Sequence, residues 1–170
     1  MVCLAVAIFV LLGALAPASW ASIHPLTESN INLLLSVHNE MRRNERSGLQ
    51  DLTWNEELAS RAQNWADGCF YGNERNVPFG ENIAARKYMI GTDSSAIVFI
   101  MQNWMEESLV NTDGSFSCCT KEDWSCCHLK QVLQPMATTV GCGIKFCESL
   151  PSQFDELTDA AYLVCYYDAR

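Results

Sequence analysis

The chain has 170 residues, of which 49% are hydrophobic, and it carries a formal net charge of −9. This length is enough for about one domain. The negative charge argues against a nucleic-acid-binding protein, which needs a basic face, and gives no reason to expect attraction to anionic lipid.

The N-terminal segment is typical of a secretory signal peptide. Met1 to Leu15 contains no charged side chain, a proline ends the apolar run, and the small residues Ser19 and Ala21 suit cleavage after Ala21. The alternative is a membrane anchor, but the run is shorter than the roughly 20 residues that span a bilayer. We therefore expect residues 1–21 to be removed and residues 22–170 to form a single secreted domain without a transmembrane anchor.

Three helices are predicted in the first two thirds of the chain. The first is expected over residues 27–43, with apolar residues at helical spacing and His38 on their face. The second begins at a capping box, residues 53–56, in which a threonine hydroxyl and a glutamate carboxylate satisfy free amide donors. The third begins at Asp93 or Ser94 as its cap and is apolar nearly all round at first, as for a helix deep in the core.

A polar loop and two strands are predicted to follow. Residues 111–125 are polar and contain cysteines, and residues 127–133 favour a short helical turn that Pro135 ends. Residues 138–147 alternate in polarity and residues 161–167 are rich in β-favouring types, which predicts an antiparallel hairpin with a long acidic loop. Helices on both faces would give an α+β fold, a disulfide-stabilised three-layer α-β-α sandwich with a small antiparallel sheet.

The cysteine content predicts a disulfide-bonded protein. Of nine cysteines, Cys3 lies in the expected signal peptide, which leaves an even set of eight. An even set in an exported chain indicates four disulfides. Zinc bound by thiolates is the alternative, but the two adjacent doublets lack the usual gap of zinc motifs. Spacing alone does not choose the pairing. The eight are Cys69, Cys118, Cys119, Cys126, Cys127, Cys142, Cys147 and Cys165.

Four titratable side chains have ordinary explanations when each is taken alone. His38, on an apolar helix face, is most simply a core histidine satisfied by a neighbour. Glu107 is most simply an edge carboxylate that reaches water. Glu81 follows an aromatic residue and a glycine and is most simply a loop acid, and His128 follows a cysteine. Individually, none of them establishes a site.

Seven short segments, taken in order, resemble the signature of the CAP family, which includes cysteine-rich secretory proteins, venom antigen five and plant pathogenesis-related class one proteins. The match covers essentially residues 29–168, and the order and gaps of the segments carry it. The segments are VHNEMR at 37–42, LTWNEEL at 52–58, GENI at 80–83, WMEE at 104–107, HLKQV at 128–132, VGCG at 140–143 and LVCYY at 163–167.

The resemblance implies a cavity lined by two histidines and two glutamates, which match His38, Glu81, Glu107 and His128. Two neutral imidazoles can bind a divalent ion and leave positions open to water, so His38 and His128 are the expected ligands of a zinc or magnesium ion. The glutamates would orient the imidazoles.

The resemblance also implies a disulfide pairing. It joins Cys126 to one of Cys118 and Cys119, which leaves Cys127 with the other. The remaining implied bridges are Cys69–Cys147 and Cys142–Cys165.

The function that the resemblance implies is a non-enzymatic extracellular binding or effector module in immunity, venom or defence. Its partner would be a lipid, a sterol or a receptor protein, and the chain would be a monomer or a weak dimer. The apolar run at residues 96–101 would either line a lipid groove or, more simply, pack in the core.

Two other functions remain open at the level of sequence. A metal-dependent extracellular hydrolase or protease is the main alternative, because a metal beside two histidines and two glutamates can activate water. The chain contains neither an HExxH motif nor a serine elbow. The third interpretation is a structural extracellular module whose cleft no longer binds anything.

Overall fold

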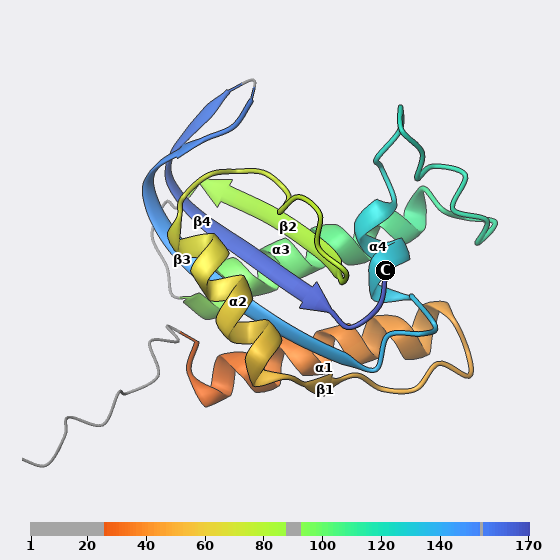
Figure 1. Ribbon diagram of the computed structural model, residues 1–170. Coiled ribbons are helices and arrows are strands. Elements are labelled where there is room, and N and C mark those ends of the chain that lie inside the picture. The colour runs from red at the N-terminus through yellow and green to blue at the C-terminus, as the bar shows by residue number, and fades with distance from the viewer. Residues whose placement is uncertain (1–25, 88–92, 154) are drawn as a thin grey trace, which may run out of the picture.

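The computed structural model describes residues 26–87, 93–153 and 155–170 (Figure 1). The predicted signal peptide, residues 1–21, lies outside the described residues. The helices are α1 (Glu28–Glu45), α2 (Glu56–Asp67), α3 (Asp93–Glu106), the 3-10 helix η1 (Glu107–Leu109) and α4 (Cys127–Val132). The strands are β1 (Thr53–Trp54), β2 (Gly80–Lys87), β3 (Thr139–Pro151) and β4 (Glu156–Tyr167).

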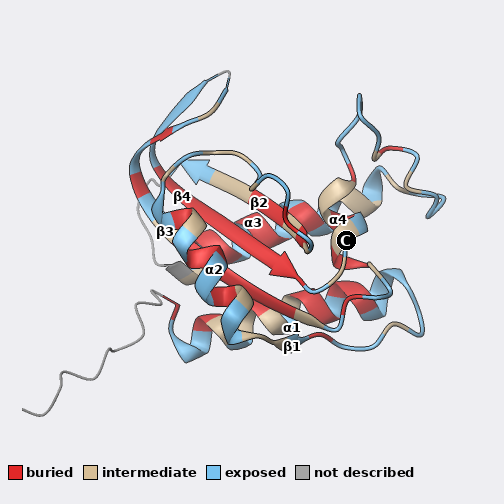
Figure 2. Ribbon diagram, in the orientation of Figure 1, coloured by how far each residue is buried: buried red, intermediate tan, exposed pale blue. Residues whose placement is uncertain are grey.

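The four strands form one sheet in the order β1-β3-β4-β2. The β3–β4 and β4–β2 pairs are antiparallel, and the short β1 runs parallel to β3. Helix α2 covers one face of the sheet, and α1, α3 and α4 lie on the other (Figures 1 and 2). Each face has its own buried apolar cluster. This arrangement confirms the predicted three-layer α-β-α sandwich.

Two features of the sheet differ from the prediction. Strand β2 contains Glu81, for which the sequence predicts a loop. The hairpin strands also continue through the segment predicted to be a long acidic loop, and pair as far as Pro151 and Glu156. This end of the ribbon projects beyond the helices and is mostly exposed (Figure 2). Its residues therefore lack the apolar alternation that identifies a half-buried strand.

The start of α1 agrees with the prediction, whereas the cap of α2 does not. Thr27 caps α1, since its hydroxyl accepts a hydrogen bond from the Asn30 amide at 3.2 Å. Helix α2 begins two residues later than the capping box predicts. Its cap is Asn55, whose Oδ1 accepts from the amides of Glu57 and Leu58, both at 3.0 Å. Thr53 does not cap the helix because it pairs with β3.

The disulfides agree with the implied pairing and resolve its open choice. One bridge ties the end of α2 to β3, another joins β3 to β4, and two staple the cysteine-rich loop to the start of α4. The bridges are Cys69–Cys147, Cys142–Cys165, Cys118–Cys126 and Cys119–Cys127.

Helix α2 packs unusually close to β3 because glycines face it. A Cβ atom at Gly141 would lie 2.2 Å from the Ala59 amide nitrogen, and one at Gly143 would lie 2.4 Å from the Gln63 Cα atom. The Gln63 side chain then bonds both the amide and the carbonyl of Ile144, at 3.1 and 3.0 Å. In the described part of the chain, no helix is both long and apolar enough to cross a membrane.

Candidate functional site

His38 lies in the core with both ring nitrogens engaged. Nδ1 donates to the Leu34 carbonyl at 2.8 Å, so Nε2 accepts from the Tyr167 hydroxyl, also at 2.8 Å. The Tyr167 oxygen in turn accepts from the Asn82 side-chain amide at 3.1 Å. Burial lowers the pKa of His38 to about 4, against the opposing effect of the bond to Leu34. His38 is therefore a neutral, satisfied core histidine.

The neighbours of His38 in its motif are structural as well. Asn39 bonds the amide and the carbonyl of Leu52, at 2.7 and 3.0 Å. The buried guanidinium of Arg42 donates to four backbone carbonyls at 2.7–3.2 Å. Two of these, Val132 and Gln134, lie at the C-terminal end of α4, where a positive charge is favourable.

Glu107 holds the opposite end of α4. Its Oε1 lies 2.6 Å from His128 Nδ1, and its Oε2 accepts from the Leu129 amide at 2.8 Å. The carboxylate thus satisfies a free donor at the positive end of the helix. Glu107 at one end and Arg42 at the other fix the position of α4 and of the histidine that it carries.

His128 is engaged on three sides. Besides its contact with Glu107, Nε2 lies 3.1 Å from the Ile83 carbonyl of β2, and the ring stacks on Trp104 at a centroid distance of 5.4 Å. Both nitrogens face acceptor oxygens, which are 2.6 and 3.1 Å away. In this arrangement neither nitrogen points at a metal ion or a substrate in open space.

Glu81 is the second carboxylate near His128. It accepts from the Asn73 side chain at 3.0 Å and from the Glu74 amide, and burial is the main effect that raises its pKa. Glu74 differs because Arg61 and the Tyr166 hydroxyl bond its carboxylate and lower its pKa. Among the described residues, no cation pairs with Glu81.

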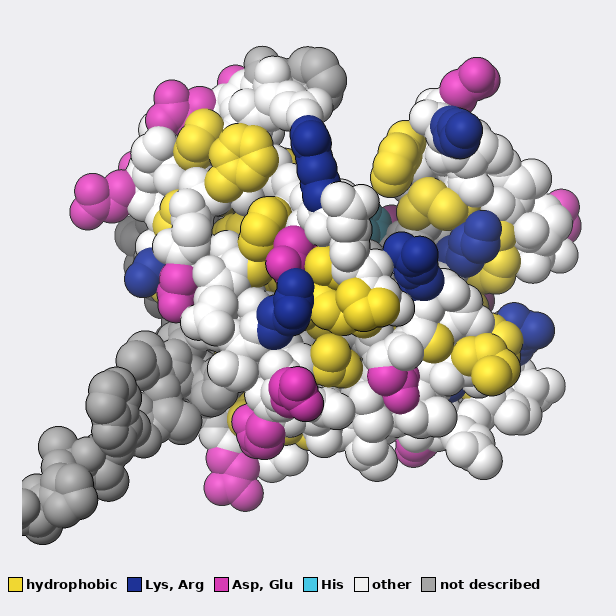
Figure 3. All heavy atoms as spheres, viewed as in Figure 1, with side chains coloured by type: hydrophobic (Ala, Val, Ile, Leu, Met, Phe, Trp, Pro, Cys, Tyr) yellow, Lys and Arg dark blue, Asp and Glu magenta, His cyan; other side chains and the backbone are white. Residues whose placement is uncertain are grey.

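A cavity of about 290 Å³ opens between β2, α4 and the cysteine-rich loop, and we call it the histidine cavity. Figure 3 shows a cleft in this part of the surface, with histidine atoms visible at its floor. Glu81, His128 and Trp124 are among its lining residues. A second cavity of about 570 Å³, the aromatic cavity, adjoins it, and the two share Asn73, Ile83 and Trp124.

The structure brings together three of the four side chains that the resemblance places in one cleft, and places the fourth, His38, elsewhere. Glu107 contacts His128, and Glu81 and His128 line the same cavity. His38 is fully buried and does not line the histidine cavity. The prediction that His38 completes this cleft is therefore wrong, and the simpler interpretation of His38 as a core residue is the correct one.

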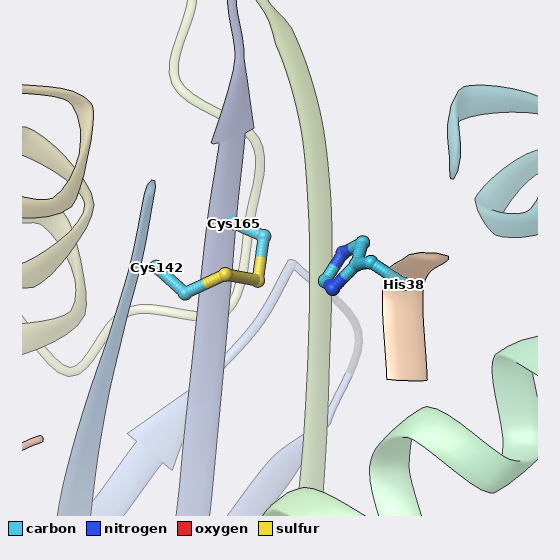
Figure 4. Close-up of side chains that lie close together, drawn as sticks. All are labelled: His38, Cys142 and Cys165. Carbon is cyan, nitrogen blue, oxygen red and sulfur yellow. A yellow bond between two sulfur atoms is a disulfide. The ribbon is translucent and has the colours of Figure 1, made fainter. Parts of the chain in front are cut away.

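The donor set does not fit a metal held by two histidines. In the described residues, the only group of three potential ligands within 4.8 Å of one another is His38 with Cys142 and Cys165 (Figure 4). These two sulfurs are joined in a disulfide and carry no thiolate charge. His38 and His128 occur together in no such group.

Sequence reasoning missed two residues of this region. Asn73 bonds Glu81 and lines both cavities, but a single asparagine in a loop gives no signal by itself. Trp124 is 66% exposed between the two cysteine doublets. A large aromatic residue in an otherwise polar, stapled loop is a signal from which it could have been found.

Comparison with known proteins agrees with this fold. The model of the cysteine-rich secretory protein (CAP) family matches residues 35–167. Venom allergen 3 homolog of Dinoponera quadriceps is 29% identical over 164 residues, which cover 84% of this chain and 68% of that protein. Peptidase inhibitor 16 of Homo sapiens is 29% identical over 155 residues, which cover 89% of this chain but only 32% of that protein.

Solved structures show the same architecture. The crystal structure of NaASP2 with Zn2+ superposes with a TM-score of 0.70 at 19% identity, covering 85% of this chain and 82% of that one. Venom allergen-like protein 4 of Schistosoma mansoni gives 0.64 at 20% identity, covering 85% and 90%. At these identities the similarity shows the fold.

Proposed function

The chain belongs to the cysteine-rich secretory protein (CAP) family, and on that basis we propose that it is a secreted, non-enzymatic extracellular binding module. The apolar N-terminal run and the four disulfides support export, with removal of residues 1–21 and residues 22–170 as the mature domain. Relatives named as venom allergens and cysteine-rich secretory proteins support the same location.

One observation carries the preference for binding over catalysis. His128 is the imidazole on the histidine cavity, and both of its nitrogens face acceptor oxygens of Glu107 and Ile83. A general base needs a free lone pair within reach of the proton that it removes. The cavity therefore offers a place for a ligand without an activated base, which favours binding over hydrolysis.

The ligand that we propose is a lipid, a sterol or a segment of a receptor protein, bound in the groove that the two cavities form. The histidine cavity, at about 290 Å³, is at the small end of the range for ligand pockets, and the adjoining aromatic cavity extends it. Glu81 is a carboxylate without a counter-ion among the described residues, so it favours a ligand with a hydroxyl or amide donor and disfavours an anionic head group.

We propose that ligand binding requires no metal ion. A zinc or magnesium ion at His128 would need the ring to turn away from Glu107 or Ile83, and no second imidazole of the described residues groups with it. The zinc of the NaASP2 structure is a property of that protein. Binding of zinc or magnesium to this chain would thus require the histidine cavity to rearrange.

Binding, metal and peptide-hydrolysis assays on residues 22–170 test this function. We expect palmitate or cholesteryl sulfate to bind in the presence of a chelator, and to bind more tightly in Glu81→Gln, because the substitution removes a negative charge that repels both anions. We expect no peptide hydrolysis above background, and size-exclusion chromatography to give a monomer or a weak dimer. Metal-dependent hydrolysis that disappears in His128→Ala, but persists in Glu106→Gln, would establish the hydrolase instead.

A further inference from the structure

The aromatic cavity has apolar walls that remain in contact with water. Its lining includes Phe70, Tyr71, Ile83 and Trp124. Phe70 is 47% exposed and Trp124 is 66% exposed, although both are among the largest apolar side chains. Large apolar side chains left exposed around one hollow are typical of a binding surface. The volume of about 570 Å³ suits a small organic ligand.

Disulfides and backbone bonds hold these walls in place. Phe70 directly follows Cys69, which is bridged to β3, and Trp124 precedes the doublet that is bridged to the same loop. The Tyr71 amide donates to the Pro151 carbonyl at 2.9 Å. Walls fixed before the ligand arrives lose little conformational entropy on binding, which favours affinity.

Arg75 is the one charged residue among the described residues that line the aromatic cavity. It is exposed, and within the described part of the chain it forms no ion pair and no hydrogen bond. Arg61 and Arg43 differ, because Arg61 bonds Glu74 and Arg43 bonds Asp51. A free guanidinium presents a planar set of donors that matches a carboxylate.

The net charge of −9 opposes an anionic ligand at long range. At physiological salt, however, charges are screened beyond about 8 Å. The contacts inside the cavity therefore decide the ligand's preference. Those contacts are aromatic faces and the guanidinium of Arg75.

We propose that the aromatic cavity binds a small amphiphilic carboxylate, with the apolar body against Trp124 and Phe70 and the carboxylate on Arg75. This inference rests on the proposed role as a binding module and names the ligand class for one part of its groove. Both aromatic and aliphatic carboxylates have the required chemistry, and the experiment separates them.

A matched pair of ligands tests the role of the charge. Indole-3-acetate and its neutral amide, indole-3-acetamide, are titrated into residues 22–170 and followed by NMR or calorimetry, with octanoate as the aliphatic arm. We expect the acetate to bind about tenfold more tightly than the amide, as for a hydrogen bond to a charged group. If octanoate binds as tightly as indole-3-acetate, the cavity accepts aliphatic and aromatic carboxylates alike. If octanoate binds more weakly, the cavity prefers aromatic rings.

Variants separate the two halves of the site. Arg75→Gln should remove the preference for the acid, because it deletes the charge of an exposed side chain and leaves the fold intact. Lys121→Gln, an exposed cation outside the lining, should leave all affinities unchanged. Trp124→Ala should weaken the acid and the amide by a similar factor.

Two results would overturn the inference. Equal binding of acid and amide, or an unchanged preference in Arg75→Gln, would remove the carboxylate site while leaving a binding module in place. Failure of all three probes to bind would also remove it. The proposed function is then judged separately, by the palmitate and sterol assay with Glu81→Gln.

Discussion

His38 and His128 both contact the indole of Trp104, at centroid distances of 6.3 and 5.4 Å, yet their surroundings differ. His38 is closed in the core, where a carbonyl and a tyrosine hydroxyl satisfy a neutral ring. The side chain of His128 is 33% exposed and is paired with a carboxylate on the edge of a cavity. Burial and partners, more than residue type, decide which histidine is available for function.

Among the substitutions considered, Arg42→Ala in the core around His38 should reduce stability the most. The substitution leaves four backbone carbonyls without their donor, including two at the end of α4. We expect a loss of about 4 kcal/mol in the free energy of unfolding, measured by urea denaturation. Its exposed neighbour is the control, since Arg43→Ala removes only a surface ion pair worth less than about 1 kcal/mol. Similar losses for the two variants would contradict the assignment.

His38 should make stability depend on pH. Burial lowers its pKa from an ordinary 6.5 to about 4, so between these values the unfolded chain binds a proton that the folded chain does not. The contribution of His38 to the free energy of unfolding is therefore full above pH 6.5. It decreases as the pH falls, by about 3 kcal/mol at pH 4. The measurement is the difference in unfolding free energy between wild type and His38→Gln across this range. A constant difference would refute the neutral, buried state.

Glu107→Gln tests the surroundings of His128 at the histidine cavity. The amide retains the shape but weakens the contacts with the His128 ring and the Leu129 amide. We expect a loss of about 2 kcal/mol in unfolding free energy and a shift of the His128 ring resonances in NMR spectra. Glu106→Gln, an exposed neighbour in α3, should leave both unchanged. His128 resonances insensitive to Glu107→Gln would mean that the pair does not form in solution.

Glu81 should have the smallest effect on stability, and its contribution should change with pH in the direction opposite to that of His38. Burial raises its pKa above the ordinary 4.5, so its charged form opposes folding as the pH rises past that value. We expect Glu81→Gln to be at least as stable as wild type at pH 7, with the difference shrinking toward pH 4. Thermal unfolding at the two pH values measures this. A variant that loses stability at pH 7 would indicate that a cation pairs with Glu81.

The parts of the fold with strong local patterns were predictable. Helices α1 and α3 repeat apolar residues at helical spacing, and the alternation at the start of β3 marks a strand. Strand β2 was missed because its sequence, GENIAARK, has one β-branched residue, and its partner β4 lies far along the chain. Long-range pairing of this kind leaves little trace in a local pattern.

The candidate site was only partly predictable for a different reason. The motif around residues 128–132 correctly indicated a histidine near Glu107, because both belong to the matched signature. The motif at residues 37–42 shows that a histidine is present, but its depth depends on the packing of Tyr167 and Asn82 around it. Asn73 enters the site through a loop whose course the sequence does not specify.

The cysteine doublets raise a question of isomerism. Each cysteine of the first doublet is bonded to the one eight positions later. Exchanging partners would give a nested form, Cys118–Cys127 with Cys119–Cys126, of identical mass and equal oxidation. Because both forms satisfy every thiol, oxidation alone does not select between them. The contacts of Glu107 with His128 and the Leu129 amide at the start of α4 can then select the native pairing, because they lower the energy of the isomer in which they form.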